Sequence, residues 1–336
     1  MWKRIYGFIA ITATLLLADQ TLYSDANRSL YDSPKNRSMG GSLMAISSEP
    51  MPSGLAAGIT SSAKTELYLG YAGFYGNLFG ATTIGFTHPV DTVQSIGGSV
   101  SYLMIPGVDS ITIENNGGIP GAMTNTEQTA SELYVNLVYG RNLLNFSRGK
   151  LSAGGSLHMK RIRLIETTGY GIGADVSVQS RFNSGVAVGV KVENVFTEYG
   201  YWTKEYHENG LPRLYIGSGF DRNFTKSFGI KVAYRSPDIF GNSGVNGGSV
   251  SKKAQFESDP KELKLSENPG MLFTSAAIGT ELLFSKTVAV RAGLSENHML
   301  NFGGGVHLFD RWDVDFVYSY SGALDGTYSL STKIQL

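Results

Sequence analysis

Alternation of apolar and polar residues runs through almost the whole chain and strongly limits what it can fold into. The clearest run has valine at every second position: Val186, Val188, Val190 and Val192. A two-residue period places alternate side chains on opposite faces of a strand. Fourteen such runs are predicted to be strands: 65–74, 79–86, 96–104, 131–142, 151–164, 170–180, 185–196, 212–223, 227–236, 271–283, 286–294, 299–309, 311–321 and 326–336.

The connections between these runs differ in length according to parity. The three longest, 105–130, 197–211 and 237–270, all follow odd-numbered strands, and every connection after an even-numbered strand is short. A soluble β-sandwich also alternates, but it gives no reason for this segregation. Outer-membrane barrels have an even strand number, short periplasmic turns and long outer loops. The pattern therefore predicts an all-β chain that forms a 14-stranded antiparallel transmembrane β-barrel with both termini in the periplasm.

The N-terminus has the pattern of an export signal. Lys3 and Arg4 precede an apolar run, Ile5 to Ala18, that is too short to span a membrane as a helix. The alternative is a buried N-terminal helix. Small residues at Ser24 and Ala26 offer a cleavage site, so we expect a signal peptide at 1–26 and a location in the bacterial outer membrane.

The segment 27–62 breaks the alternation and is rich in Ser, Gly, Met and Pro. We expect it to be a separate, buried element, with the barrel occupying 63–336.

Two motifs in this segment resemble the N-terminal hatch of the FadL-type outer-membrane transport family. That family carries Met-Gly-Gly-Ala-Phe followed by Asn-Pro-Ala-Gly-Leu, and Met51 and Ser53 depart from the second motif. The matching residues are Met39, Gly40, Gly41, Pro52, Gly54 and Leu55. Nearly the whole mature chain, including 171–175, 189–195 and 211–217, is similar to the PorV-like branch of the family.

The resemblance implies a barrel whose N-terminal hatch plugs the lumen. FadL-type proteins take up hydrophobic ligands passively, and long-chain fatty acids are the expected ligand class. The alternatives are a PorV-like scaffold or shuttle barrel for exported proteins, and a general porin with an unplugged lumen. The hatch is expected to line one side of an apolar pocket through Met39, Gly40, Gly41, Leu43, Met44, Ile46, Met51, Pro52, Gly54 and Leu55.

The connection 105–130 carries several apolar side chains. They could form a patch where a ligand enters, or they could pack over the barrel mouth. The residues concerned are Ile105, Val108, Ile111 and Ile113.

Charged residues at inward-facing positions form a third group of candidates. Buried charges need partners of opposite sign, and this group contains both signs. We expect a network that ties the wall to the hatch, and the alternative is a polar lane for solutes or protons. The group comprises Lys160, Asp175, Lys191, Glu193, Arg291, Asp313 and Asp315.

Other classes of function have little support in the sequence. The 28 basic and 28 acidic residues give no net charge to attract nucleic acid, and the absence of cysteine excludes disulfides and thiolate sites. The glycines from Gly169 to Gly173 lack the following helix of a phosphate-binding loop. We therefore expect no enzyme activity, cofactor or metal. The expected partners are a hydrophobic small molecule, outer-membrane lipid and the barrel-assembly machinery, with an exported protein as a further possibility.

Overall fold

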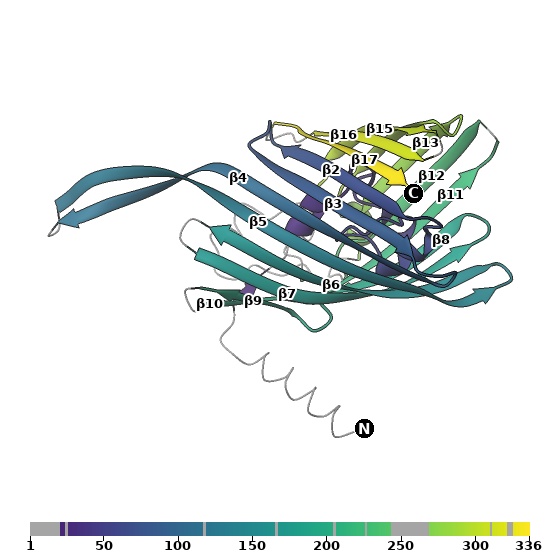
Figure 1. Ribbon diagram of the computed structural model, residues 1–336, viewed down its shortest axis with the longest axis horizontal. Coiled ribbons are helices and arrows are strands. Elements are labelled where there is room, and N and C mark those ends of the chain that lie inside the picture. The colour runs from purple at the N-terminus through teal and green to yellow at the C-terminus, as the bar shows by residue number, and fades with distance from the viewer. Residues whose placement is uncertain are drawn as a thin grey trace, which may run out of the picture.

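Fourteen long strands close into an antiparallel barrel (Figure 1). The computed structural model describes residues 21–23, 26–116, 119–164, 167–203, 206–225, 227–242, 269–309, 311–320 and 325–336. All fourteen predicted strands are present, and the last pairs with the first, so the predicted fold class is confirmed. The barrel strands are β2 (Glu66–Phe74), β3 (Phe79–Pro89), β4 (Gln94–Asn116), β5 (Ile119–Phe146), β6 (Gly149–Leu164), β7 (Thr167–Phe182), β8 (Val186–Glu193), β11 (Arg213–Asn223), β12 (Phe228–Arg235), β13 (Ala277–Phe284), β14 (Val288–Leu294), β15 (Leu300–Leu308), β16 (Trp312–Tyr320) and β17 (Thr327–Gln335).

The barrel wall has its apolar side chains on the outer face and its polar ones on the inner face, the reverse of a soluble protein. In β8 the side chains of Val186, Val188 and Val190 are exposed on the outside, whereas Ala187 and Lys191 are buried. In β16, Phe316, Tyr318 and Tyr320 are exposed while Asp315 and Ser319 are buried. The barrel therefore presents apolar side chains outward and small or charged ones inward.

The segment 27–62, called the plug below, lies inside the barrel (Figure 1). It contains η1 (Ala26–Tyr31), α2 (Pro34–Ser38), η2 (Leu43–Ala45) and η3 (Ala56–Ser61). α2 packs on β14, β15, β16 and β17, η2 on β8, β11 and β12, and η3 on β4 to β7. The plug thus contacts the wall around most of its circumference.

Local chemistry explains where α2 begins and ends. Ser33 is its N-cap, with Oγ accepting from the Asn36 N–H at 3.1 Å, and Pro34 occupies the first turn, where no N–H is needed. Gly40 and Gly41 follow with φ of 70° and 82°, a left-handed region that glycine adopts without strain. The chain can therefore turn sharply into η2.

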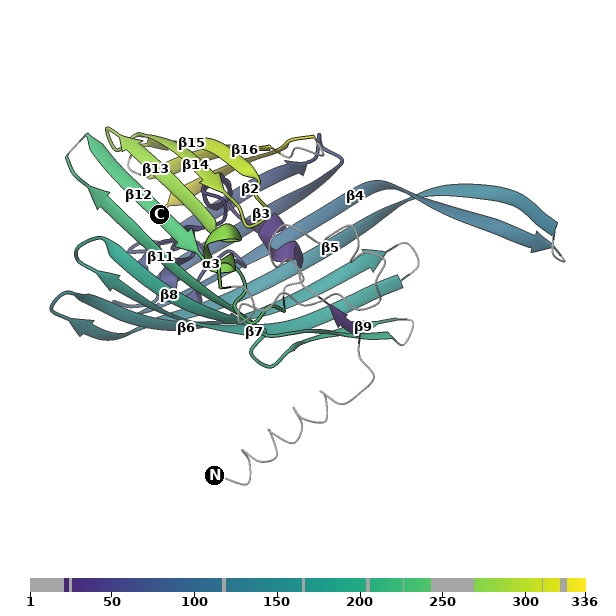
Figure 2. The same cartoon turned by 180° about the vertical axis from the view of Figure 1, so that it is seen from behind.

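The connection predicted at 105–130 is not a loop. β4 and β5 continue beyond the wall as a two-stranded arm that projects from one end of the barrel (Figures 1 and 2). Its pairing is interrupted by register shifts at Ile105/Val108 and Ile113/Asn115. The loop prediction was wrong because the β-branched residues Ile111, Thr112 and Ile113 favour a strand, and the length of a connection does not show whether its residues pair.

Shorter elements occupy other predicted connections. β9 (Glu198–Trp202) and β10 (Tyr206–Gly210) form a hairpin within 197–211, and β1 (Thr21–Tyr23) pairs in parallel with β10. The strand predicted from residue 271 instead begins at Ala277, because α3 (Met271–Thr274) makes a single helical turn first.

Several predicted features concern residues that the structure does not describe. Most of the predicted signal peptide, residues 1–20 and 24–25, and residues 243–268 of the connection 237–270 lie outside the described part. In the part that is described, no helix is long and apolar enough to cross a membrane.

Candidate functional site

The hydrogen-bond ladder of the wall has an irregularity where β7 changes partner. Val176 on β7 pairs with Val192 of β8, but Ile172 pairs with Tyr199 of β9. Between these two pairs, three residues of β7 (173–175) are opposed by six residues of the segment that joins β8 to β9 (193–198). The extra residues bulge at Asn194 to Thr197, and both Asn194 and Thr197 have positive φ. A bulge of this kind re-aims side chains near it.

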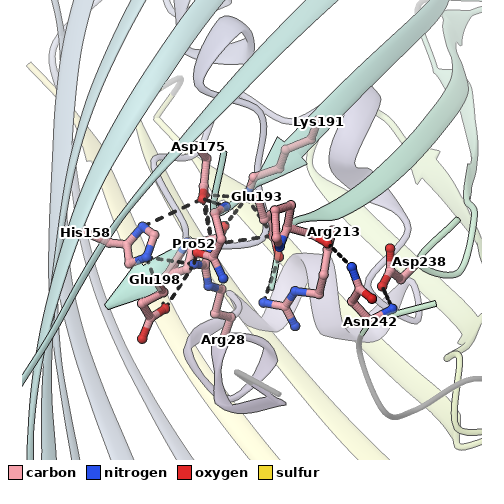
Figure 3. A network of polar contacts seen from close by, with 12 residues as sticks. Arg28, Pro52, His158, Asp175, Lys191, Glu193, Glu198, Arg213, Asp238 and Asn242 are labelled. Atoms are coloured by element: carbon pink, nitrogen blue, oxygen red, sulfur yellow. Dashed lines mark hydrogen bonds and ion pairs between the residues drawn. The ribbon is translucent and has the colours of Figure 1, made fainter. Parts of the chain in front are cut away.

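Charged side chains fill the lumen beside this bulge (Figure 3). Arg28 of the plug lies at their centre, with Nη1 bonded to the two Asp175 oxygens at 2.8 and 3.1 Å. Its Nη2 donates to Asn194 Oδ1 at 2.6 Å and lies 3.6 Å from Glu198 Oε2. We call the group the Arg28 cluster; its members are Arg28, His158, Lys160, Asp175, Lys191, Glu193, Glu198 and Arg213, all buried.

The remaining members balance the charges around Arg28. Lys191 lies 2.9 Å from Glu193 and 3.3 Å from Asp175, and Arg213 lies 2.9 Å from the other Glu193 oxygen. Lys160 pairs with Glu198. Because each carboxylate has at least two cationic neighbours, the cluster satisfies the requirement that buried charges be paired.

The cluster joins the plug to the wall. Lys191 also donates to the Pro52 carbonyl oxygen of the plug at 2.5 Å, and Gln179 of β7 donates to the Ala45 carbonyl at 2.8 Å. Arg28 is the charged side chain that the plug contributes to the cluster. The arrangement is that of an anchor, in which wall strands β6, β7, β8 and β11 hold one end of the plug.

A second set of lumen charges lies on the opposite wall. Glu281 bonds Arg291 at 2.5 Å and Lys231 at 3.1 Å, and Arg291 also bonds Asp315 at 2.6 Å. Asp313 lies 3.2 Å from Lys333 and contacts His307. The structure thus brings the seven predicted lumen charges into two groups, with Lys160, Asp175, Lys191 and Glu193 in one and Arg291, Asp313 and Asp315 in the other.

The apolar residues predicted to line a pocket pack against glycines of the wall. A Cβ added to Gly217 would lie 2.8 Å from Met44 Cε, and one added to Gly219 would lie 2.6 Å from Ile46 Cγ2. The Leu55 side chain lies against Gly189 in the same way, and the backbone and Cβ of Met39 lie against Gly279. Leu43 packs with Met39, and Met51 lies against Gly85. These side chains fit into gaps that a larger wall residue would close.

A cavity beside the plug is bordered by charged side chains. It has a volume of about 120 Å³ and is bordered by Gly40 and Gly41 together with Asp32, Arg235 and Glu296. Burial raises the pKa of both Asp32 and Glu296 despite nearby arginines. Pro52 and Gly54 lie elsewhere, buried or half-buried in the turn before η3. The role of the ten plug residues in a ligand pocket stays a prediction.

The four residues of the predicted access patch lie on β4. Ile105 and Val108 are half-buried where the arm leaves the wall. Ile111 and Ile113 lie farther along the arm, and their side chains are outside the described part. Whether this patch admits a ligand also stays a prediction.

Sequence reasoning missed Arg28, His158, Glu198 and Arg213 as members of the cluster. Arg28 lies in the plug, where no periodicity shows which way a side chain points, and its partner Asp175 is 147 positions away. Glu198 follows the bulge, which shifts the inward register. Among the described residues no group of histidine and carboxylate side chains could hold a metal ion.

Comparisons with known proteins find a similar fold in solved transporters and channels. No family model and no curated protein sequence matches the chain. The solved toluene transporter TbuX of Ralstonia pickettii is similar over 91% of this chain and 98% of its own, with a TM-score of 0.52 and 10% identity. The toluene transporter TodX of Pseudomonas putida is similar over 90% of this chain and 97% of its own, with a TM-score of 0.52 and 8% identity. The monoaromatic hydrocarbon channel CymD is similar over 90% of this chain and 97% of its own, with a TM-score of 0.50 and 12% identity. At these identities the likeness shows the fold.

Proposed function

We propose that the protein is an outer-membrane barrel that binds hydrophobic small molecules and lets them pass without an energy source. The observation that carries the proposal is the combination of an apolar outer face with a plugged, charged lumen. An apolar exterior on a closed barrel is suited to lipid, because closure leaves no unpaired backbone group facing hydrocarbon. Export through a signal peptide at 1–26 is part of this proposal.

Hydrophobic cargo is supported by the shared fold. The similar solved proteins are described as toluene transporters and a monoaromatic hydrocarbon channel, so the ligand class includes small aromatic hydrocarbons as well as fatty acids. A plug that contacts most of the wall blocks free diffusion of polar solutes, which is why a general porin is not proposed. The closer likeness to the PorV-like branch remains part of the sequence-based prediction.

Passage requires the plug to shift. Met39, Met44 and Leu55 are buried against wall glycines in this structure, so a pocket that they line would open when these contacts separate. Movement of the plug at the Arg28 cluster would have to exchange buried ion pairs between plug and wall. We therefore propose that the plug residues form the hydrophobic passage and that the Arg28 cluster holds it closed.

The test is ligand binding by refolded protein. Binding of toluene and of laurate would be measured by equilibrium partitioning into proteoliposomes, with empty liposomes as the reference. Saturable binding of either compound is expected, and laurate binding without toluene binding would favour the fatty-acid class. Absence of saturable binding for both would refute hydrophobic cargo, and recovery of the native protein outside the outer-membrane fraction would refute the location.

A scaffold function is the second candidate, and the β4–β5 arm favours it. The arm projects beyond the other strands (Figure 2), where it could reach a partner without obstructing the lumen. Deleting residues 106–129 and joining the shortened strands by a two-residue turn tests this role. Ligand binding should survive the deletion, whereas a scaffold would lose its exported protein partner from cross-linked cells.

A further inference from the structure

A cavity of about 300 Å³ lies at the end of the lumen that carries the short turns. Its rim includes Lys286 and Thr287 in the turn between β13 and β14, and Asn223 at the end of β11. Lys35 of α2 borders it from the plug side. The cavity therefore lies between plug and wall and opens where the connecting turns are shortest.

Four cations border this cavity: Lys35, Lys231, Lys286 and Arg291. The carboxylates on its wall are already engaged. Glu281 is paired with both Lys231 and Arg291, and Asp315 is paired with Arg291. Asp313, the third carboxylate, is paired with Lys333 and contacts His307.

Lys35 is the cation left over from this pairing. Its ammonium group has no hydrogen bond or ion pair with any residue in the described ranges, although it is half-buried. The neighbouring Lys231 ammonium, followed by burial, lowers the pKa of Lys35 below its usual range. Lys333 and Arg291 add to this effect, and Glu281, which is already paired with Lys231 and Arg291, opposes it. A half-buried cation with more like than opposite charge near it is destabilised unless a further negative group approaches.

We propose that this cavity is a binding site for a small oxyanion, a carboxylate or phosphate group, held by Lys35 with Lys286 at the rim. Such a group would accept the hydrogen bonds that Lys35 does not make within the protein and would offset the repulsion from Lys231. Charge-assisted bonds of this kind are among the stronger hydrogen bonds in proteins. The site does not depend on hydrophobic uptake, since it opens at the rim and needs no movement of the plug.

Calorimetric titration of the refolded barrel in a non-ionic detergent tests the site. The titrants are sodium phosphate and sodium acetate at constant ionic strength, with laurate as a third arm. Saturable binding of phosphate or acetate is expected, and Lys35→Met should weaken it at least about tenfold, which corresponds to about 1.4 kcal/mol. Lys35→Arg should retain binding.

Two further variants keep the test decisive. Lys64→Met, which removes an exposed cation outside the cavity, should leave the affinity unchanged. Lys286→Met, at the exposed rim, should weaken binding less than Lys35→Met and is informative even if the latter folds poorly. The proposal is overturned if neither small anion binds saturably, if Lys35→Met binds as tightly as the parent, or if laurate alone binds, because the apolar tail would then be the recognised group.

Discussion

Replacing Arg28 by methionine should loosen the plug while leaving the wall strands paired. Methionine keeps much of the side-chain length but removes the charge. The change eliminates the bonds to Asp175 at 2.8 and 3.1 Å and the bond to Asn194 at 2.6 Å. All three connect the plug to strand β7 or to the bulge that follows β8.

The free-energy cost of Arg28→Met depends on the ion pairs that remain in the cluster. Removing one partner of a buried ion pair typically costs about 3–5 kcal/mol. The lower end applies here, because Lys191 still lies 3.3 Å from Asp175 and Lys160 still pairs with Glu198. About 3 kcal/mol corresponds to an increase of roughly 10²-fold in the population with the plug displaced.

A single introduced thiol measures that population. The chain contains no cysteine, so Ser42→Cys, at a fully buried plug position, provides a unique probe. When opening and closing are fast, the labelling rate is proportional to the open population. Arg28→Met should therefore accelerate labelling about 10²-fold in this background.

The matched control is Arg148→Met, which removes an exposed arginine from the turn between β5 and β6. It should change the labelling rate less than about threefold, since exposed substitutions usually cost under about 0.5 kcal/mol. A rate in Arg28→Met within twofold of the parent would refute the anchoring role of the cluster. The same acceleration in both variants would refute its specificity.

Three other predictions address packing, charge and pH. Gly154→Ala should destabilise the protein by about 1–3 kcal/mol, because the added Cβ would lie 2.5 Å from the backbone of Ala56 and Ala57 in η3. Gly155→Ala is the control and should be nearly neutral, since its Cβ meets only Asp175 O at 3.4 Å. Equal midpoints of the two variants in urea unfolding would show that the plug does not press on the wall at Gly154. Lys35→Met should stabilise the anion-free protein by roughly 1 kcal/mol, because it removes repulsion from Lys231, and a lower unfolding midpoint would contradict this. Burial raises the pKa of Glu296, which lies in the connection between β14 and β15. The stability contributed by its protonated form is therefore present at low pH and is lost as pH rises through the folded-state pKa. The unfolding midpoint of Glu296→Gln should rise relative to that of the parent between pH 4.5 and 7.5, and a constant difference would contradict the shift.

The strands were predictable because each carries its own two-residue period. Val186 to Val192 specifies a strand and its outward face without reference to any other part of the chain. The same rule, applied to Ile111 and Ile113, would have predicted the arm. Met271 begins a helical turn in place of a strand, and its apolar neighbours suit either structure.

The candidate site was only partly predictable, because plug and wall use different rules. Lys191 and Asp175 could be assigned to the lumen from strand alternation, but no period orients Arg28 within a 3₁₀ helix. The wall glycines against which the plug packs could not be recognised from the sequence either. Gly217 and Gly279 fit a strand for many reasons, and only the structure shows that Met44 and Met39 occupy the space above them.

The seating of the plug also constrains the order in which the protein can fold. The plug precedes every barrel strand in the sequence, yet its contacts with the wall extend to β17, and Arg28 must find Asp175 147 positions later. Contacts between such distant positions form slowly, because the intervening chain must first lose its freedom. The plug is synthesised before the wall and therefore cannot reach its final place until most of the wall exists. Its final contacts form only as the strands assemble around it and β17 pairs with β2.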